Sequence, residues 1–379
     1  MDERLAAEWP ARRERLDDRL EQEGIDALFL PPSADLEYLT GVERDLPSFG
    51  EIIYAHNWVT GAFFVPGREP LFVLPRMFVA FHLGGDEPGE LVVVNELDDG
   101  EALFRAAVAR LGDIGTIALG PRTSGRTTLG IQDALPGAQV VDGGSLVAGL
   151  RRVKSALELE LMTVACGMAD AAMAATAPRV VPGVTMRELQ EDIEHELSVR
   201  GSRCPSFPTH IFSWLGHDSS DATGAEPIAE GECVMFDFGG VHSGYCSDFG
   251  RTIVAGEPPA GYLDAYAVML EAQEAGRAAL VPGALARDVN SACRGPIEAA
   301  GFGAAFRHRM GHGIGLDVHE RPFLSPEDDT MLEAGMVFTD EPSILLDGSF
   351  GVRIEDVVVC AEGGGRVLNR LDPGPLSPD

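Results

Sequence analysis

The fold is decided by the stretch ECVMFDFGGVHSGYCSDFGRT, residues 232–252. Its two apolar runs carry one acidic residue each, Asp237 and Asp248, and the sequence Gly-Gly-Val-His-Ser-Gly joins them. This pattern predicts a β-hairpin. The midpoint of 237 and 248 lies between His242 and Ser243, so we expect the two carboxylates to face each other, with Cβ atoms roughly 4.5–5.5 Å apart.

Two facing carboxylates in an apolar hairpin have two interpretations. On a solvated sheet face they need no partner. Within an apolar pair of strands they repel each other and lose hydration, which drives one of them towards the protonated form. A bound cation removes both penalties, so the hairpin is also a candidate metal site.

The elements around this hairpin occur twice. Helical stretches 156–176 and 262–279 each lead to the tripeptide Val-Pro-Gly, and then to a second helix closed by a glycine. The second copy leads on to another hairpin, GMVFTDEPSILLDGSFGVRIEDVVVC, residues 335–360. A duplicated helix–helix–hairpin unit predicts an α+β domain with an internal pseudo-two-fold repeat, whose hairpins meet at its centre.

The second hairpin repeats the acidic pair. Glu341 and Glu355 have their midpoint at Gly348, inside the turn sequence LDGSFG, so we expect them to lie opposite each other. One carboxylate pair in each repeat is hard to explain as two solvated sheet faces. The duplication therefore favours a shared cation site.

Three histidines lie between the hairpins, in HRMGHGIGLDVHE, residues 308–320. The spacing of His308, His312 and His319 would fit one helix face, but each glycine among them costs up to ~1 kcal/mol in a helix interior. We therefore expect a strand or an extended loop, in which glycine permits close backbone approach. A single histidine is usually a core residue, whereas three together favour a site.

Composition limits the class of protein. The chain has 379 residues, of which 45% are hydrophobic, which suffices for two domains. A formal net charge of −31 and a pI near 4.5 exclude nucleic acid as an expected partner. Lys154 is the only lysine among 29 basic residues. So acidic a composition, almost without lysine, indicates a halophilic protein. In molar salt the Debye length is ~3 Å, so the mutual repulsion of the acidic groups is screened.

Cysteine usage and the N-terminus indicate a cytoplasmic protein. The six cysteines are scattered and include no Cys-x-x-Cys pair, which is typical of core residues in a reducing compartment. The N-terminus has no apolar signal region, and no stretch approaches 18 consecutive apolar residues. We therefore expect neither export nor a membrane partner.

Residues 1–150 are predicted to form a separate α/β domain with a mixed sheet. Helical stretches alternate with short apolar runs typical of strands. The predicted strands are Ile25–Leu30, Ala62–Val65, Leu71–Leu74, Leu91–Val94, Thr116–Leu119 and Gln139–Val141. This half contains no phosphate loop, dinucleotide fingerprint or nucleophile elbow, so the chemistry is expected in residues 151–379.

Together these motifs resemble the pita-bread-fold metallopeptidases of the Xaa-Pro dipeptidase (prolidase) and aminopeptidase P type. The similar segments FDFGG, YCSDFGRT, RMGHGIGLDVHE, GMVFTDEP and GVRIEDVVV fall within residues 150–365. ADLEYLTGV (34–42) and RRVKSALELELM (151–162) resemble the family's N-terminal domain and domain junction. The resemblance implies a creatinase/prolidase-like domain at 1–150, a pita-bread catalytic domain at 151–379 and a homodimer.

The resemblance also implies a set of metal ligands, namely Asp237, Asp248, His312, Glu341 and Glu355. In the family's arrangement Asp237 binds one ion, His312 and Glu341 bind the other, and the remaining two carboxylates bridge them. Oxygen ligands with one imidazole suit Mn²⁺, with Co²⁺ or Zn²⁺ as alternatives, at a metal separation of ~3.5–4 Å.

The implied activity is hydrolysis of the Xaa-Pro bond of dipeptides or peptide N-termini by a metal-bridging hydroxide. Glu341 would move the proton to the leaving nitrogen. His308 and His319 would contact the substrate and the tetrahedral intermediate, and Arg353 would orient the bridging Glu355. The alternatives are a creatinase-like hydrolase or lyase on the same fold, or a non-catalytic pita-bread binding module.

One departure from the family concerns the substrate pocket. Proline-specific relatives usually carry a histidine that falls at Ser220 here, and the sequence WLGHDSSDATGAEP (214–227) offers only His217 nearby. Either His217 takes that role from a shifted loop, or the pocket differs. Segment 43–59 is either a surface loop or a part of the pocket's closure.

Overall fold

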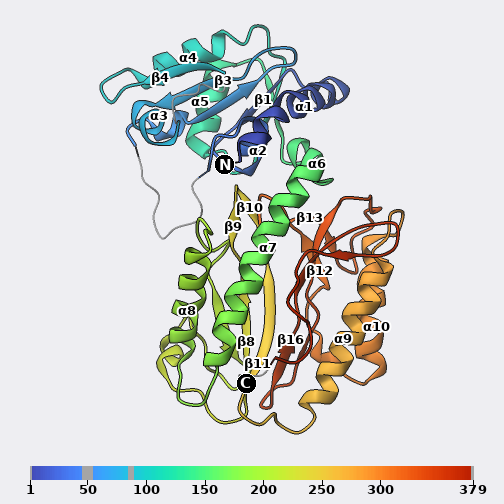
Figure 1. Ribbon diagram of the computed structural model, residues 1–379. Coiled ribbons are helices and arrows are strands. Elements are labelled where there is room, and N and C mark those ends of the chain that lie inside the picture. Colours follow the sequence, from blue (N-terminus) through green and yellow to red (C-terminus); the bar gives the residue numbers. More distant parts are fainter. Residues whose placement is uncertain (1, 45–53, 84–88, 377–379) are drawn as a thin grey trace. The chain divides into compact units, whose positions relative to one another are not determined.

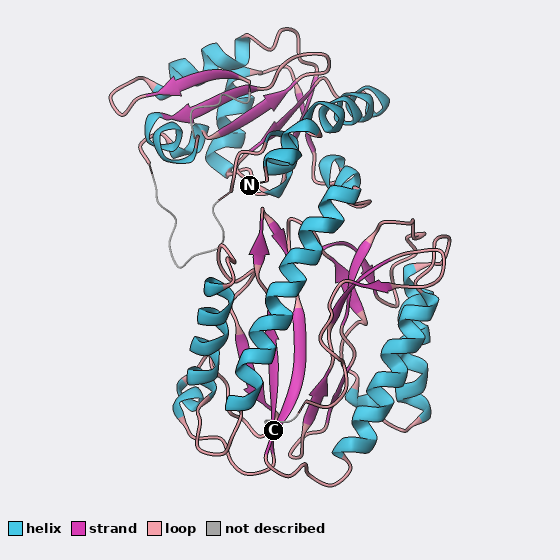
Figure 2. Cartoon of the chain, viewed as in Figure 1, coloured by secondary structure: helices cyan, strands magenta, loops and turns pink. Residues whose placement is uncertain are grey.

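The structure of the protein is a computed structural model that describes residues 2–44, 54–83 and 89–376 (Figures 1 and 2). The chain divides into two compact units, Met1–Arg151 and Arg152–Asp379. Of the segment 43–59, residues 45–53 lie outside the described residues, so its role stays a prediction.

The first unit is an α/β domain around a six-stranded mixed sheet of order β4-β3-β2-β1-β5-β6. Its strands are β1 (Ala27–Leu30), β2 (Gly61–Phe64), β3 (Leu71–Pro75), β4 (Glu90–Val94), β5 (Thr116–Leu119) and β6 (Gln139–Asp142). Its helices are α1 (Trp9–Glu23), α2 (Ala34–Thr40), α3 (Arg76–His82), α4 (Gly100–Ala109), α5 (Gly125–Ala134) and α6 (Leu146–Arg151). Central strand β1 is antiparallel to β2 and parallel to β5. All of its residues are buried, which explains its continuous apolar sequence.

The second unit contains the predicted helix repeat. Its helices are α7 (Ala156–Thr176), α8 (Met186–Val199), α9 (Tyr262–Ala279) and α10 (Ala286–Ala299). The two Val-Pro-Gly turns are built alike, since Gly183 and Gly283 have φ values of 97° and 87°. Their N–H groups donate to the carbonyls of Ile228 and Leu332 at 3.0 and 2.8 Å. Each turn is therefore hydrogen-bonded to the segment that leads into the following hairpin or strand pair.

The strands of the second unit form two sheets of order β11-β8-β7 and β13-β12-β14-β17-β18, and two short ribbons. The first repeat contributes β7 (His210–Ser213), β8 (Glu232–Phe238), β9 (Val241–His242), β10 (Tyr245–Cys246) and β11 (Phe249–Ala255). The second contributes β12 (Gly311–Gly313), β13 (Glu320–Leu324), β14 (Val337–Asp340), β15 (Ser343–Leu345), β16 (Gly351–Arg353), β17 (Asp356–Val359) and β18 (Arg366–Val367).

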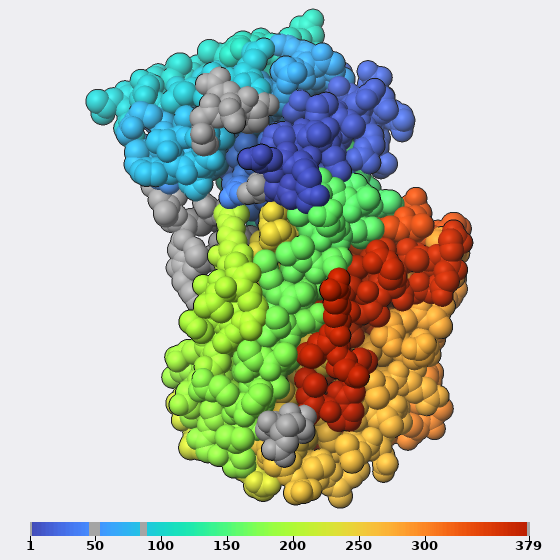
Figure 3. Space-filling model, viewed as in Figure 1, coloured from blue at the N-terminus to red at the C-terminus, as the bar shows by residue number. Residues whose placement is uncertain are grey.

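Each repeat buries a hydrophobic cluster between its helices and its strands. In the first cluster Met173 and Ile193 of α7 and α8 pack with Phe236 of β8. In the second, Met269 of α9 packs with Phe338 of β14. The hairpins lie between the two helix pairs (Figure 1). In Figure 3 the C-terminal segment, drawn in red, runs between the green and orange helices on one face of this unit.

The register of the first hairpin differs from the prediction by two residues. Asp237 lies opposite Gly250, so Asp237 and Asp248 are diagonal neighbours rather than direct partners. The cause is the turn, which is centred on Ser243 and Gly244 with φ values of 50° and 87°. A two-residue primed turn needs positive φ at both central residues, and this requirement moves the midpoint by one position.

The second hairpin has the predicted register. Val337 pairs with Val359, and further along the same hairpin Ser343 pairs with Arg353. Continuing this pairing between the two points places Glu341 opposite Glu355. Both glutamates fall in the interruptions between the paired strands. Glu355 also forms an antiparallel bridge with Gly250 of the first hairpin, so the hairpins meet at the centre of the unit as predicted.

Among the described residues, one helical segment, Ala156–Arg179, is long and apolar enough to cross a membrane by length and composition. Half of its most apolar window is buried inside the protein. Core helices of globular proteins pass the same test, so the feature is weak evidence for a membrane span.

Candidate metal centre

One cavity of about 490 Å³ brings the predicted ligands together. Its wall includes all five of them, Asp237, Asp248, His312, Glu341 and Glu355. The rest of its lining consists of Phe207, Pro208, Thr209, His210, Ser220, Val318 and His319. Of the other predicted site residues, all of which the structure describes, His217, His308 and Arg353 are not part of this lining.

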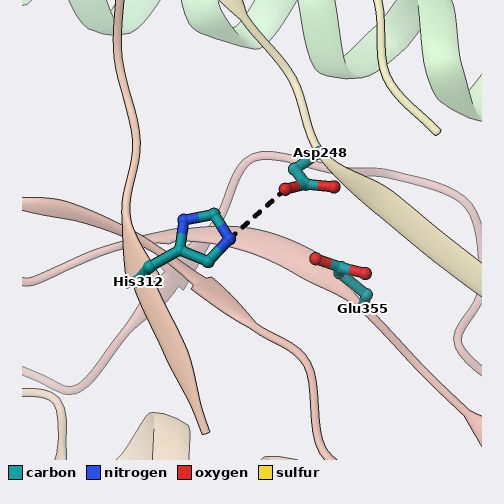
Figure 4. A group of neighbouring side chains, drawn as sticks. All are labelled: Asp248, His312 and Glu355. Atoms are coloured by element: carbon teal, nitrogen blue, oxygen red, sulfur yellow. Dashed lines mark ion pairs between the residues drawn. The ribbon is translucent and has the colours of Figure 1, made fainter. Parts of the chain in front are cut away.

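His312 lies at the centre of the cluster, on β12, which is the extended segment that the glycines predict. Its Nε2 is 3.4 Å from Oδ2 of Asp248 and 3.6 Å from Oε1 of Glu341. Ligand atoms of Asp248, His312 and Glu355 all lie within 4.8 Å of one another, and the three side chains converge (Figure 4). Its Nδ1 is 3.0 Å from the carbonyl of Gly313, which accepts its proton and leaves the Nε2 lone pair for a metal.

Burial and the other nearby carboxylates disfavour the ionised forms of these acidic side chains. Burial raises the pKa of Glu341 to about 7, although His312 and Arg353 oppose the shift. Burial, together with the charges of Asp248 and Glu341, raises the pKa of Glu355 well above its ordinary value. The pKa of Asp237 is also raised by burial, although Arg353 lowers it. This environment favours an added positive charge.

Two carboxylate oxygens show that a cation fits these residues. Oδ1 of Asp248 and Oε2 of Glu355 are buried, and neither has a hydrogen-bond partner among the described residues. A buried carboxylate oxygen without a partner is costly. Carboxylate oxygens joined by a single imidazole form a donor set that suits Mn²⁺ and similar divalent ions.

The chain is similar in sequence to known families over most of its length. Residues 160–362 match metallopeptidase family M24, and residues 12–153 match the creatinase/prolidase N-terminal domain. The chain belongs to metallopeptidase family M24. It is 36% identical over 230 residues to the Xaa-Pro dipeptidase of Pyrococcus furiosus. That alignment covers 60% of this chain and 66% of the relative, slightly less than two thirds of its length.

Solved structures of similar proteins confirm the fold class. The prolidase from Thermococcus sibiricus has a TM-score of 0.87 at 27% identity, covering 100% of this chain and 99% of that one. The X-Pro aminopeptidase from Thermotoga maritima has a TM-score of 0.82 at 27% identity, covering 96% and 99%. The M24 chain therefore has an α/β N-terminal domain with a mixed sheet, followed by the α+β pita-bread domain with its internal repeat.

Arg353 contacts a different carboxylate from the one expected. Its guanidinium donates a hydrogen bond to Oδ2 of Asp237, whereas the predicted partner of Arg353 was Glu355. Its backbone N–H donates to Oγ1 of Thr252 in the first hairpin at 2.8 Å. Arg353 therefore links the second hairpin to Asp237 of the first.

The two flanking histidines have different environments. His319 lines the cavity, and its ring packs edge-on against His312 with centroids 4.0 Å apart. Burial and the nearby His312 lower the pKa of His319. His308 lies beside the cavity lining, with Nδ1 2.7 Å from the carbonyl of Arg309 and Nε2 2.5 Å from Oγ of Ser343.

The histidine that lines the cavity together with Ser220 is His210, and not His217 as one of the two predictions had it. His217 instead pairs with Glu232, at 2.7 Å between Nδ1 and Oε1. Ser220, where the family usually has histidine, does line the cavity. No strand was predicted at β7, which carries His210, because its four residues, His-Ile-Phe-Ser, show no decisive alternation of polar and apolar side chains.

Proposed function

We propose that the chain is a dinuclear-metal-dependent peptidase that cleaves the Xaa-Pro bond of dipeptides or of peptide N-termini. The observation that carries the proposal is the convergence of five predicted ligands in one cavity, with two buried carboxylate oxygens that have no partner among the described residues. The chain's similarity to the Xaa-Pro dipeptidase of Pyrococcus furiosus and the X-Pro aminopeptidase of Thermotoga maritima supports it.

Two divalent ions would be held by the ligand set Asp237, Asp248, His312, Glu341 and Glu355. Manganese is the proposed metal, because oxygen donors dominate the set, and Co²⁺ or Zn²⁺ are the alternatives. When bound, such ions supply Lewis acidity and a nucleophilic water at neutral pH.

The chain's own residues supply proton transfer and positioning. Glu341 lines the cavity, where its carboxylate can accept a proton and return it to the leaving nitrogen. His319 faces the substrate space, whereas His308 bonds Ser343 and so holds the chain just beyond Glu341. Phe207 and Val318 offer an apolar wall to the proline ring.

The test combines metal analysis with a substrate panel. Protein stripped with a chelator is reloaded with Mn²⁺ and assayed against Xaa-Pro dipeptides, longer Xaa-Pro peptides and creatine. We expect hydrolysis of an Xaa-Pro substrate that depends on added metal, and its loss in Glu355→Ala. Metal-loaded protein that cleaves none of the Xaa-Pro substrates would contradict the proposal, and cleavage of creatine would select the creatinase-like alternative.

We further propose a cytoplasmic, halophilic homodimer that acts on small peptides and does not use nucleic acid or a membrane. The net charge of −31 supports the halophilic character and opposes nucleic acid. Within the part of the chain that the structure describes, the six cysteines form no disulfide and five of them are buried, which supports a reducing compartment. The homodimer rests on the family resemblance, and light scattering in molar KCl tests it.

A further inference from the structure

The cavity has a polar wall on β7 that the ligand set does not use. β7 pairs antiparallel with β8, and His210 lies directly opposite Asp237. Direct partners in an antiparallel pair project from the same face, so His210 points to the cavity with Asp237. The alternate residues Ile211 and Phe236 are buried in the core on the other face. The strand register therefore places this imidazole beside the metal ligands.

The second repeat contains a matching arrangement. There β12, which carries His312, pairs antiparallel with β14, the first strand of its hairpin. β7 has the same position beside β8, the first strand of the other hairpin. Each repeat thus presents an imidazole to the cavity from the strand that flanks its hairpin. His312 belongs to the ligand set, which leaves His210 for another role.

Asp218 holds His210 and Ser220 in place together. Its Oδ2 is 2.9 Å from Nε2 of His210, and its Oδ1 accepts hydrogen bonds from the N–H and hydroxyl of Ser220 at 2.8 and 2.6 Å. The His210 ring also stacks on Phe212 with centroids 4.4 Å apart. Because an ionised carboxylate only accepts, Nε2 is the donor of that bond, and in the imidazolium form Nδ1 carries a second N–H that can donate to a substrate carboxylate. The hydroxyl of Ser220 already donates to Asp218 and adds no donor.

Thr209 adds a hydroxyl that has no partner among the described residues. Its Oγ1 is buried, the residue is 4% exposed, and it lines the same cavity. A buried hydroxyl without a partner is unfavourable, and an acceptor on a ligand would satisfy it. No described lysine or arginine lines this cavity, so an anionic group of a substrate that enters it needs other donors.

We propose that Thr209 and the imidazolium form of His210 make a subsite that binds the terminal carboxylate of a dipeptide substrate. In an Xaa-Pro dipeptide this carboxylate is attached to the carbon bonded to the leaving nitrogen, and it therefore lies next to the scissile bond, as β7 lies next to Asp237. The inference rests on the proposed peptidase function and deepens it. A site built to bind a carboxylate favours dipeptides over longer peptides, which have an amide at that position.

The experiment compares His210→Gln and Thr209→Val with the control His217→Gln. His217 belongs to the same connection and also pairs with a carboxylate, but it does not line the cavity. For glycyl-proline we expect His210→Gln to raise KM about tenfold with kcat and metal content nearly unchanged. For glycyl-prolinamide the same variant should change KM little, and His217→Gln should behave as wild type on both. Equal changes on dipeptide and amide, or none on either, would overturn the proposal.

Binding of glycyl-proline separates this subsite from the peptidase function itself. Calorimetry with metal-loaded protein reports affinity whether or not turnover occurs. Tighter binding of glycyl-proline than of its amide, with the difference lost in His210→Gln, supports the subsite even in a protein that cleaves no peptide. Equal affinity of wild type for the two ligands refutes the subsite and leaves the peptidase function standing if hydrolysis is seen.

Discussion

Gly250 and Glu355 are hydrogen-bonded through both of their peptide groups. The N–H of Glu355 donates to the carbonyl of Gly250 at 2.9 Å, and the reverse bond is 3.3 Å. A Cβ added to Gly250 would lie 2.9 Å from Oε2 of Glu355 and 3.0 Å from its Cβ. The close approach of the two hairpins, which brings Glu355 to the other predicted ligands, therefore depends on a glycine at this position.

The substitution Gly250→Ala should displace Glu355. We expect Mn²⁺ affinity to fall by about tenfold or more and stability by about 1–3 kcal/mol, because the added methyl has no room. Calorimetric titration and chemical denaturation measure the two effects. The matched control is Gly167→Ala in α7, where an added Cβ meets nothing within 4 Å. It should keep the metal affinity and gain up to ~1 kcal/mol.

Removing the charge of Glu355 should have opposite effects with and without metal. Burial and the neighbouring carboxylates raise its pKa in the metal-free protein, so its ionisation at pH 8 destabilises the fold. Glu355→Gln should therefore be more stable than wild type in a chelator, by on the order of 1–3 kcal/mol. With Mn²⁺ the order should reverse, because the variant loses a ligand. Thermal denaturation in both conditions tests this, and an unchanged order would argue against a cation site.

His319 and His308 should differ in their effects on turnover. His319 lines the cavity, so His319→Gln should lower kcat about 100-fold while metal content is kept. His308 bonds Ser343 and the carbonyl of Arg309, so His308→Gln should lower kcat less, about tenfold. Steady-state kinetics of the two metal-loaded variants give the comparison. A larger loss in His308→Gln would show that it, rather than His319, meets the substrate.

The two hairpins show which parts of a register can be predicted from sequence. The second was predicted correctly, because Gly348 lies at the centre of a long turn and fixes the midpoint. The first was wrong by two residues, because the midpoint alone ignored which turn residues can adopt positive φ. Ser243 and Gly244 adopt it, and a serine–glycine pair is one of the sequences that two-residue turns favour.

Contacts between distant strands were harder to predict. The family resemblance predicts the ligand residues, but nothing local in the sequence indicates that Arg353 pairs with Asp237 across the two hairpins. His210 was missed because β7 has only four residues, too few for a periodic pattern to be decisive. Its place in the cavity follows from its pairing with β8, a tertiary contact.

Stability should rise with salt. The formal net charge of −31 makes the folded chain repel itself at low ionic strength. Raising KCl from about 0.1 M to about 1 M shortens the Debye length from about 10 Å to about 3 Å and screens this repulsion. We therefore expect a higher Tm in molar KCl, measured by thermal denaturation of the Mn²⁺-loaded protein. A constant or falling Tm would refute the halophilic assignment.

The pH dependence of stability should depend in part on His308. Burial, aided by the charge of Arg353, lowers the pKa of His308 to about 4, whereas an unfolded histidine has a pKa near 6.5. Between these values the unfolded chain binds a proton that the folded chain does not, so this residue makes stability fall as the pH falls from about 6.5 to about 4. His308→Gln should reduce the loss between pH 7 and pH 5 by about 1–2 kcal/mol.

Denaturant unfolding of wild type and variant at the two pH values measures this difference. His195→Gln is the matched control, because His195 is exposed on α8 and its replacement should leave the pH dependence unchanged. Equal pH dependence in His308→Gln and wild type would mean that His308 has the same pKa in the folded and unfolded states, and is therefore protonated at pH 5 in the folded protein. In that case Nε2 would have to donate to Oγ of Ser343. The inference that burial and Arg353 keep this imidazole neutral would then be wrong.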